Sequence, residues 1–142
     1  LTTFNPDYLV RVTSDCPLIP PFVISKHILN AVKHNHDYVS NVHPDVRTHP
    51  DGWDCEVISS RLLKWVNQYA REKSDREHVT PLIRNSPPSW ASIAHVVGYM
   101  DNSHLKLSVD TEEDLHFVRT YHEILTKKIK TVKESGQGMF RL

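Results

Sequence analysis

Short apolar runs alternate with longer segments of helical periodicity along this 142-residue chain. Five runs are rich in β-branched and apolar residues and are bounded by turn-forming residues, which is typical of strands. These predicted strands span residues 8–13, 37–42, 56–58, 93–99 and 105–109. The intervening polar stretch 43–53, rich in His and Pro, predicts a loop.

Four segments predict helices. After Pro20 and Pro21 a helix is expected to bury Ile24, Ile28, Ala31 and Val32. A second helix begins at Ser59, and its inner face comprises Leu62, Leu63, Val66, Tyr69 and Ala70. The run 74–77 has a capping-box pattern that predicts a short helix, which Pro81 bends or ends. The last helix begins at Thr111, with a stripe of Leu115, Val118, Tyr121 or His122, Leu125 and Ile129.

Strands that alternate with helices predict an α/β fold with a partly parallel sheet. Residues 1–129 are expected to form one folded unit, and residues 130–142 a flexible or partner-bound tail, because the periodicity is lost from Lys130. Ligands of such sheets bind beyond the carboxyl ends of the strands. This rule selects Asp15 and Asp110, which each follow a predicted strand.

Composition narrows the class of protein. Seventeen basic and seventeen acidic residues give a formal net charge of zero, which offers no electrostatic argument for a nucleic acid or an anionic membrane as partner. The apolar runs are far shorter than the ~20 residues that a membrane span needs. Cys16 and Cys55 are too few for a disulfide framework, so we expect a cytoplasmic protein.

Two candidate sites remain open at this point. Asp15 and Asp110 could hold Mg²⁺, or could instead form a turn and a helix cap. Arg76 and His78, near a helix start, could bind a carboxylate or phosphate, or could be solvent-exposed. The histidines and cysteines lack the paired spacing of a zinc site, and Cys16 fits a small buried residue better than a nucleophile.

Five stretches in sequence order resemble one family. They are RVTSDCPLI at 11–19, DYVSN at 37–41, PDGWDCEV at 50–57, REHVTP at 76–81 and VDTEEDL at 109–115. The resemblance is to the cytidylyltransferase family of spore coat polysaccharide biosynthesis proteins, relatives of the CMP-sugar-acid synthetases. It implies a three-layer α/β/α nucleotide-diphospho-sugar transferase fold. It also implies that this chain is the C-terminal portion of the domain, without the N-terminal nucleotide-binding half and its glycine-containing loop.

The resemblance also assigns site residues. It implies that Asp15 and Asp110 hold Mg²⁺, which binds a triphosphate whose α-phosphorus is attacked by a sugar oxygen with loss of pyrophosphate. The other implied substrate contacts are Arg11, Ser14, Asn41, Asp54, Glu56, Arg76 and His78. Ser14 stands where family members usually have Gly, and Pro20 where an acid is common.

These implications predict a function. The chain is expected to belong to an enzyme that uses CTP or another nucleotide to activate a sugar or sugar acid as a CMP-sugar for surface polysaccharide, and to be inactive alone. A glycosyltransferase of similar fold and a non-catalytic binding module remain alternatives. We expect a homodimer or pairing with the missing half, and neither a nucleic acid nor a membrane as partner.

Overall fold

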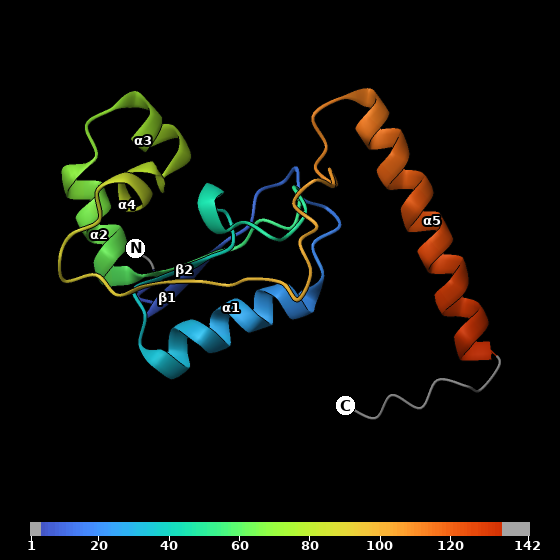
Figure 1. Cartoon of the computed structure of the whole chain (residues 1–142), viewed down its shortest axis with the longest axis horizontal. Coiled ribbons are helices and arrows are strands. Elements are labelled where there is room, and N and C mark those ends of the chain that lie inside the picture. The colour runs from blue at the N-terminus through green and yellow to red at the C-terminus, as the bar shows by residue number, and fades with distance from the viewer. Residues whose placement is uncertain (1–3, 135–142) are drawn as a thin grey trace.

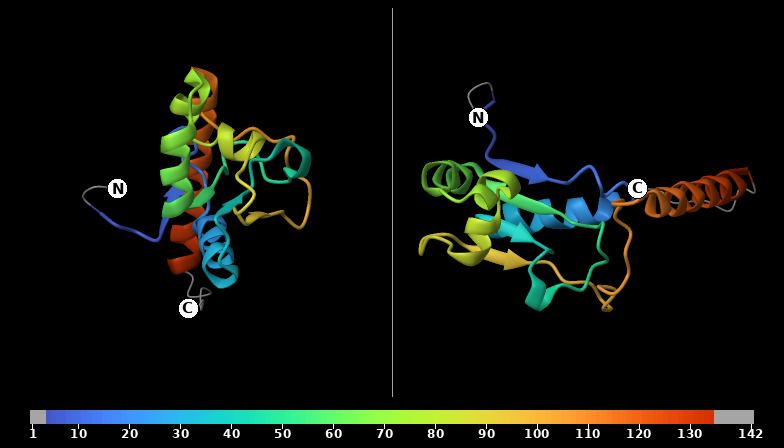
Figure 2. Two further views of the ribbon diagram at one scale, coloured as in Figure 1. Left: turned by 90° about the vertical axis from the view of Figure 1, so that its left-hand side faces the viewer. Right: turned by 90° about the horizontal axis from the view of Figure 1, so that it is seen from above.

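The computed structural model describes residues 4–134, which form a mixed α/β fold around one sheet. The four strands are β1 (Tyr8–Arg11), β2 (Tyr38–Ser40), β3 (Glu56–Ser59) and β4 (Ile93–His95). They lie in the order β1-β3-β2-β4, which can be followed from top to bottom in the right-hand view of Figure 2. β3 is antiparallel to both neighbours, and β2 and β4 form a parallel pair, so the sheet is partly parallel as predicted.

The prediction of a strand at 105–109 was wrong. This segment forms a single bridge between Asp51 and Lys106, outside the sheet. Leu105 is 43% exposed, so its apolar sequence does not reflect a place in the core. β4 is also shorter than predicted, since it ends at His95.

Apolar side chains fill both faces of the sheet. Tyr38 and Ile58 pack with Leu62, Val66 and other residues on the face covered by α2 (Ser60–Tyr69) and α4 (Pro81–Asn85). Val39 and Val57 pack on the opposite face against Ala31 of α1 (Pro21–His34). Figure 1 shows α1 below the sheet and α2–α4 above one end of it. Alternation along β2 and β3 therefore sends neighbouring residues to opposite cores.

The predicted inner face of α1 was confirmed at Ala31 and at Ile28, which packs against the core, and was wrong at Val32. Val23, His27 and Ala31 are buried, whereas Val32 is 59% exposed. His27 occupies an apolar position because its Nδ1 lies 2.7 Å from the carbonyl oxygen of Val23, which satisfies one ring nitrogen inside the protein.

The observed starts of α3 and α2 can be compared with the predicted ones. The short helix α3 (Lys73–His78) begins after Glu72 with no side-chain cap, so the predicted capping box at 74–77 was wrong. The helix α2 was expected to begin at Ser59; it begins at Ser60, and the Ser59 hydroxyl caps it by accepting a hydrogen bond from the Leu62 N–H at 3.2 Å. Tyr69, predicted on the inner face of α2, is half exposed because it lies at the end of the helix.

The last helix, α5 (Glu112–Glu134), extends away from the rest of the molecule (Figures 1 and 2). Thr111 and Asp114 cap it reciprocally, with hydrogen bonds of 2.9 and 3.2 Å between backbone N–H groups and side-chain oxygens. Of the predicted stripe, Val118 is buried, whereas Leu125 and Ile129 are exposed. The helix runs past Lys130 to Glu134, and residues 135–142 of the predicted tail lie outside the described residues.

Within residues 4–134, none of the helices is long and apolar enough to cross a membrane.

Candidate functional site

A cavity of about 320 Å³ lies at the end of the sheet where β1 and β2 end and β3 begins. The residues that line it come from four parts of the chain: Arg11, Thr13, Asp15, Val42, Asp54, Glu56, His78, Thr80 and Arg84. Because β3 is antiparallel to β1 and β2, its amino end meets their carboxyl ends at this edge. Five of the nine predicted site residues are therefore brought together: Arg11, Asp15, Asp54, Glu56 and His78.

Glu56 forms the charged base of the cavity. It lies opposite Arg11 in the register of β1 and β3, and its side chain is 2% exposed. Arg11 Nη1 donates to Glu56 Oε2 at 2.6 Å, and the Tyr38 hydroxyl donates to Oε1. Burial, reinforced by the negative charge of Glu56, raises the pKa of Tyr38 far above its ordinary value. Tyr38 therefore stays protonated and keeps donating to the carboxylate.

Asp54 and Asn41 fix the loop that precedes β3. Arg47 Nη2 donates to Asp54 Oδ1 at 2.6 Å, and burial raises the pKa of Asp54 although Arg47 opposes this effect. The Asn41 amide donates to the Trp53 carbonyl at 2.7 Å and accepts the Cys55 N–H at 2.9 Å. Asn41, a predicted substrate contact, thus has both ends of its amide bound to backbone and does not line the cavity.

Asp15 lies just beyond β1 and carries an available carboxylate. A hydrogen bond from Thr13 lowers the pKa of Asp15, with a smaller contribution from the positive charge of Arg11. Among residues 4–134, Asp15 forms no ion pair. This carboxylate is therefore ionised at neutral pH and free to bind a cation.

The structure brings the segment of Asp110 beside Asp15 through the backbone. The Val109 N–H donates to the Asp15 carbonyl at 2.9 Å. Gly52 permits this arrangement: its φ is +98°, and a Cβ there would lie 2.4 Å from the backbone of Leu107. The Asp110 carboxylate itself pairs with Lys106 at 2.9 Å and lies outside the lining of the cavity.

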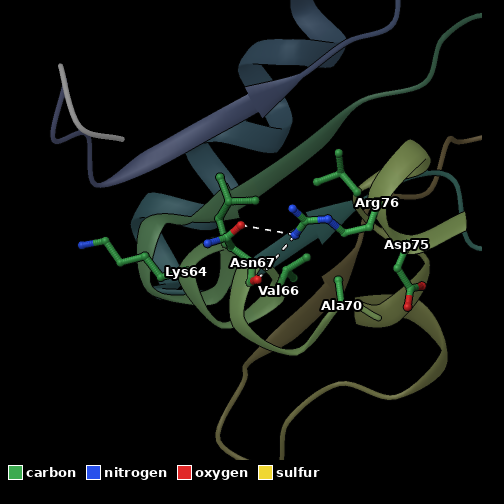
Figure 3. Close-up of a pocket in the computed structure, with 8 residues that line it drawn as sticks. Lys64, Val66, Asn67, Ala70, Asp75 and Arg76 are labelled. Atoms are coloured by element: carbon green, nitrogen blue, oxygen red, sulfur yellow. Dashed lines mark hydrogen bonds between the residues drawn. The ribbon is translucent and has the colours of Figure 1, made fainter. Parts of the chain in front are cut away.

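Two further predicted site residues, Ser14 and Arg76, do not line this cavity. Ser14 is exposed and does not line the cavity. Arg76 lies over a separate cavity of about 540 Å³ between α2 and α3, where its Nη1 donates to the Asn67 side chain at 3.3 Å (Figure 3). Arg76 and His78 therefore line different cavities, although they are two residues apart on α3.

Sequence reasoning missed the remaining residues of the site. Four residues line the cavity that the sequence analysis did not propose for the site: Thr13, Val42, Thr80 and Arg84. Tyr38, whose hydroxyl donates a hydrogen bond to Glu56, was not proposed either. Arg84 had a usable signal, since it follows the REHVTP motif by three residues.

The two thiols are poorly suited to nucleophilic chemistry. Burial raises the pKa of Cys16, and it raises that of Cys55 to about 12, so both remain protonated at neutral pH.

The chain is similar to several known proteins. A family model described as cytidylyltransferase matches residues 1–142. A cytidylyltransferase structure from Leptospira borgpetersenii superposes with a TM-score of 0.80 at 23% identity, over 96% of this chain and 60% of that one. An uncharacterised protein of Methanocaldococcus jannaschii is 31% identical over 112 residues, which are 78% of this chain and 44% of that protein. An alpha-L-rhamnosidase of Alteromonas is 32% identical over 87 residues, 54% of this chain and 10% of that protein. The chain thus spans less than half the length of both curated relatives.

Proposed function

Because the chain belongs to the cytidylyltransferase family, we propose that its cavity is the sugar-binding side of a nucleotidyl-transfer site. The enzyme would activate a sugar or sugar acid as a CMP-sugar for surface polysaccharide, such as that of a spore coat, in the cytoplasm. The observation that carries the proposal is the unpaired carboxylate of Asp15 at the carboxyl end of β1, beside the segment that bears Asp110. A nucleotidyl transfer needs such carboxylates to hold a metal and its triphosphate.

The two aspartates suit Mg²⁺. This ion is commonly held by one or two carboxylates, with water and substrate phosphate oxygens as its other ligands. Asp15 is free of ion pairs, and the exposed Asp110 can exchange the Lys106 ammonium for a metal. Among the described residues no group of three or more His, Cys, Asp or Glu side chains forms a closed metal site, which fits an ion whose remaining ligands come from substrate. When bound, Mg²⁺ would neutralise charge on the phosphates.

The other residues position the sugar. Arg11, Glu56 and Tyr38 form a hydrogen-bonded chain that fixes the base of the cavity. Asp54 and Thr80 also line the cavity, and their side-chain oxygens are groups of the kind that bind sugar hydroxyls. Such transfers depend mainly on positioning and on charge stabilisation, so a rigid base of this kind is the main contribution of the chain.

The nucleotide is assigned to another segment. The four glycines of the chain are Gly52, Gly98, Gly136 and Gly138, and none follows the first strand as a phosphate-binding loop would. The family resemblance implies such a loop in an N-terminal half of the domain, and in support this chain covers 60% of the Leptospira chain. We therefore propose that CTP binding requires this other half, with which residues 1–129 assemble.

The test measures pyrophosphate release from CTP, sugar and Mg²⁺ by an enzyme that contains this chain and a nucleotide-binding half. Asp15→Asn and Asp110→Asn are each expected to reduce turnover by about 100-fold or more, the scale of losing one electrostatic stabiliser. Asp45→Asn is the control, because Asp45 is exposed and outside the cavity. Unchanged turnover in both test variants would remove the assignment of the metal site.

A further inference from the structure

Lys106 has a position that the proposed function leaves unexplained. Its Nζ lies 2.9 Å from Asp110 Oδ2 and 2.7 Å from Asp114 Oδ2, so one ammonium joins two carboxylates. Asp110 is one of the two aspartates proposed to hold Mg²⁺. The Lys106 ammonium and a metal ion would therefore compete for the same carboxylate.

The two carboxylates differ in how far other contacts fix them. Asp114 is fixed at the start of α5, because its Oδ2 also accepts the Asp110 and Thr111 N–H groups at 3.0 and 2.9 Å. Its side chain is 20% exposed, whereas that of Asp110 is 56% exposed. Among the described residues, the only other partner of the Asp110 carboxylate is the Ser108 hydroxyl at 3.3 Å. A second cation can therefore take Asp110 from Lys106 and leave the pair with Asp114 intact.

Lys106 has hydrogen-bond donors available for a ligand once it leaves Asp110. An ammonium carries three donors on a flexible stem. In the part of the chain that the structure describes, this ammonium faces Asp110 and Asp114, and its side chain is 46% exposed. The group of three residues has one net negative charge, and it would have one net positive charge with Mg²⁺ added. Such a group attracts an anion.

We propose that Lys106 is a phosphate-binding residue that changes partners when the metal binds. Before the metal binds, its ammonium holds the Asp110 carboxylate in place. Once that carboxylate coordinates Mg²⁺, Lys106 keeps Asp114 as a partner and donates to an oxygen of the triphosphate. This inference rests on the proposed function, and it adds a residue of this chain to the binding of the nucleotide.

A purely structural role for Lys106 predicts a different result from an exchange of partners. If Lys106 only fixed the start of α5, its removal would disorder Asp110 and weaken the binding of metal and phosphate alike. An exchange predicts opposite effects on the two affinities. Removal of a competing cation strengthens metal binding, whereas removal of a charged donor weakens phosphate binding. The direction of both changes therefore distinguishes the two roles.

The test measures both affinities on the 142-residue chain by NMR. The probes are Mn²⁺ alone, followed by broadening of the amides around Asp110, and tripolyphosphate in excess Mg²⁺, followed by amide shifts. Lys106→Met is expected to bind Mn²⁺ about 2- to 5-fold more tightly, because an exposed ion pair contributes up to that factor. It should bind tripolyphosphate about 10- to 100-fold more weakly, because a hydrogen bond to a charged group contributes that factor. Lys106→Arg should retain most of the tripolyphosphate binding, and Lys33→Met, exposed at the end of α1, should change neither affinity.

Two results with Lys106→Met would overturn the inference: Mn²⁺ binding that is unchanged or weaker, and tripolyphosphate binding that is unchanged. The Cε signal of Lys106 in the original chain needs no variant. It should shift when Mg²⁺ is added and shift again with tripolyphosphate, and a signal that responds to neither would refute the exchange. If Asp110→Asn abolishes the Mn²⁺ effect but Lys106→Met changes neither affinity, the inference fails and the proposed metal site stands. Equal Mn²⁺ broadening in the original chain and in Asp110→Asn would refute the metal site itself.

Discussion

Replacing Arg11 by methionine is expected to cost far more stability than replacing its partner Glu56 by glutamine. The Glu56 side chain is 2% exposed, whereas that of Arg11 is 33% exposed. Without Arg11, the buried Glu56 carboxylate loses its ion pair and keeps the hydrogen bond from the Tyr38 hydroxyl. Breaking a buried pair in this way costs about 3–5 kcal/mol. The partial exposure of Arg11 favours the lower value, about 3 kcal/mol.

Replacing Glu56 by glutamine is expected to cost less stability than replacing Arg11 by methionine. Glutamine at position 56 keeps an oxygen that can accept from Tyr38, and water can reach the Arg11 guanidinium at its exposed side. We expect a loss of about 1 kcal/mol, which is typical of one hydrogen bond. The double variant should lose about 1–2 kcal/mol, because it leaves no unpaired buried charge. The two substitutions should therefore couple by at least about 2 kcal/mol.

Urea denaturation followed by tryptophan fluorescence measures these differences, since the chain has three tryptophans. With a typical slope of about 2 kcal/mol per molar urea, Arg11→Met should lower the midpoint by about 1.5 M. Arg71→Met, at an exposed arginine without a described ion pair, serves as the control and should leave the midpoint nearly unchanged. Equal losses in the two single variants, or additive losses in the double variant, would refute the view that Glu56 is a buried charge held by Arg11.

Three further predictions concern stability and association. Burial lowers the pKa of His27, so the unfolded chain binds more protons below about pH 6.5, and this residue should lower the free energy of unfolding by up to about 1.4 kcal/mol per pH unit, in addition to His49 and His95, whose pKa values burial also lowers. His27→Asn, which keeps a donor to the helix backbone, should flatten this dependence in urea titrations between pH 7 and 5; an unchanged slope would contradict the assignment. Gly52→Ala should cost more than about 1 kcal/mol, because the residue has φ +98° and no room for a Cβ, and hydrogen exchange at the Leu107 amide should accelerate. The exposed stripe of α5 should make the chain self-associate in sedimentation experiments, and Leu125→Glu with Ile129→Glu should reduce this; a monomeric original chain at high concentration would count against it.

Local patterns predicted the elements whose signals lie within a few neighbouring residues. β1 and β3 follow from short apolar runs, and the apolar stripe of α2 predicted a start at Ser59, one residue before the observed Ser60. The apolar stripe of the last helix likewise predicted a start at Thr111, one residue before the observed Glu112. In each case the stabilising contacts are close along the chain, so the pattern carries the information.

Predictions that depend on distant contacts were less successful. The apolar run at 105–109 has the composition of a strand, but its neighbour is the loop at Asp51 and not the sheet. His27 is buried because the face of α1 that contains Val23, His27 and Ala31 packs against the sheet. Periodicity alone had predicted a neighbouring face, with Ile24 and Ile28 in place of Val23 and His27. Tyr38 was read as a strand residue, and its role emerges only when β2 and β3 pair and bring Glu56 to its hydroxyl.

The same distinction between local patterns and distant contacts applies to the residues of the site. The rule for the carboxyl ends of strands selected Asp15, which lines the cavity, and Asp110, whose preceding segment is not a strand of the sheet. Glu56 stands at the amino end of β3 and was assigned to the site by the family resemblance alone. Arg84 was recognised as a site residue from the structure, where α4 brings it to the cavity, and its position three residues after the REHVTP motif was the sequence signal that could have found it.

The four residues of β3 leave little freedom for changes of chain length during evolution. Glu56 and Ile58 face the cavity and the core beneath α2, while Val57 faces the core beneath α1. Inserting or deleting one residue within β3 would exchange these faces, moving a carboxylate into an apolar core and a valine into the cavity. Insertions are better tolerated in exposed connections, where no such alternation is imposed. Homologous genes are therefore expected to differ in length on either side of β3 and to keep its four codons in register.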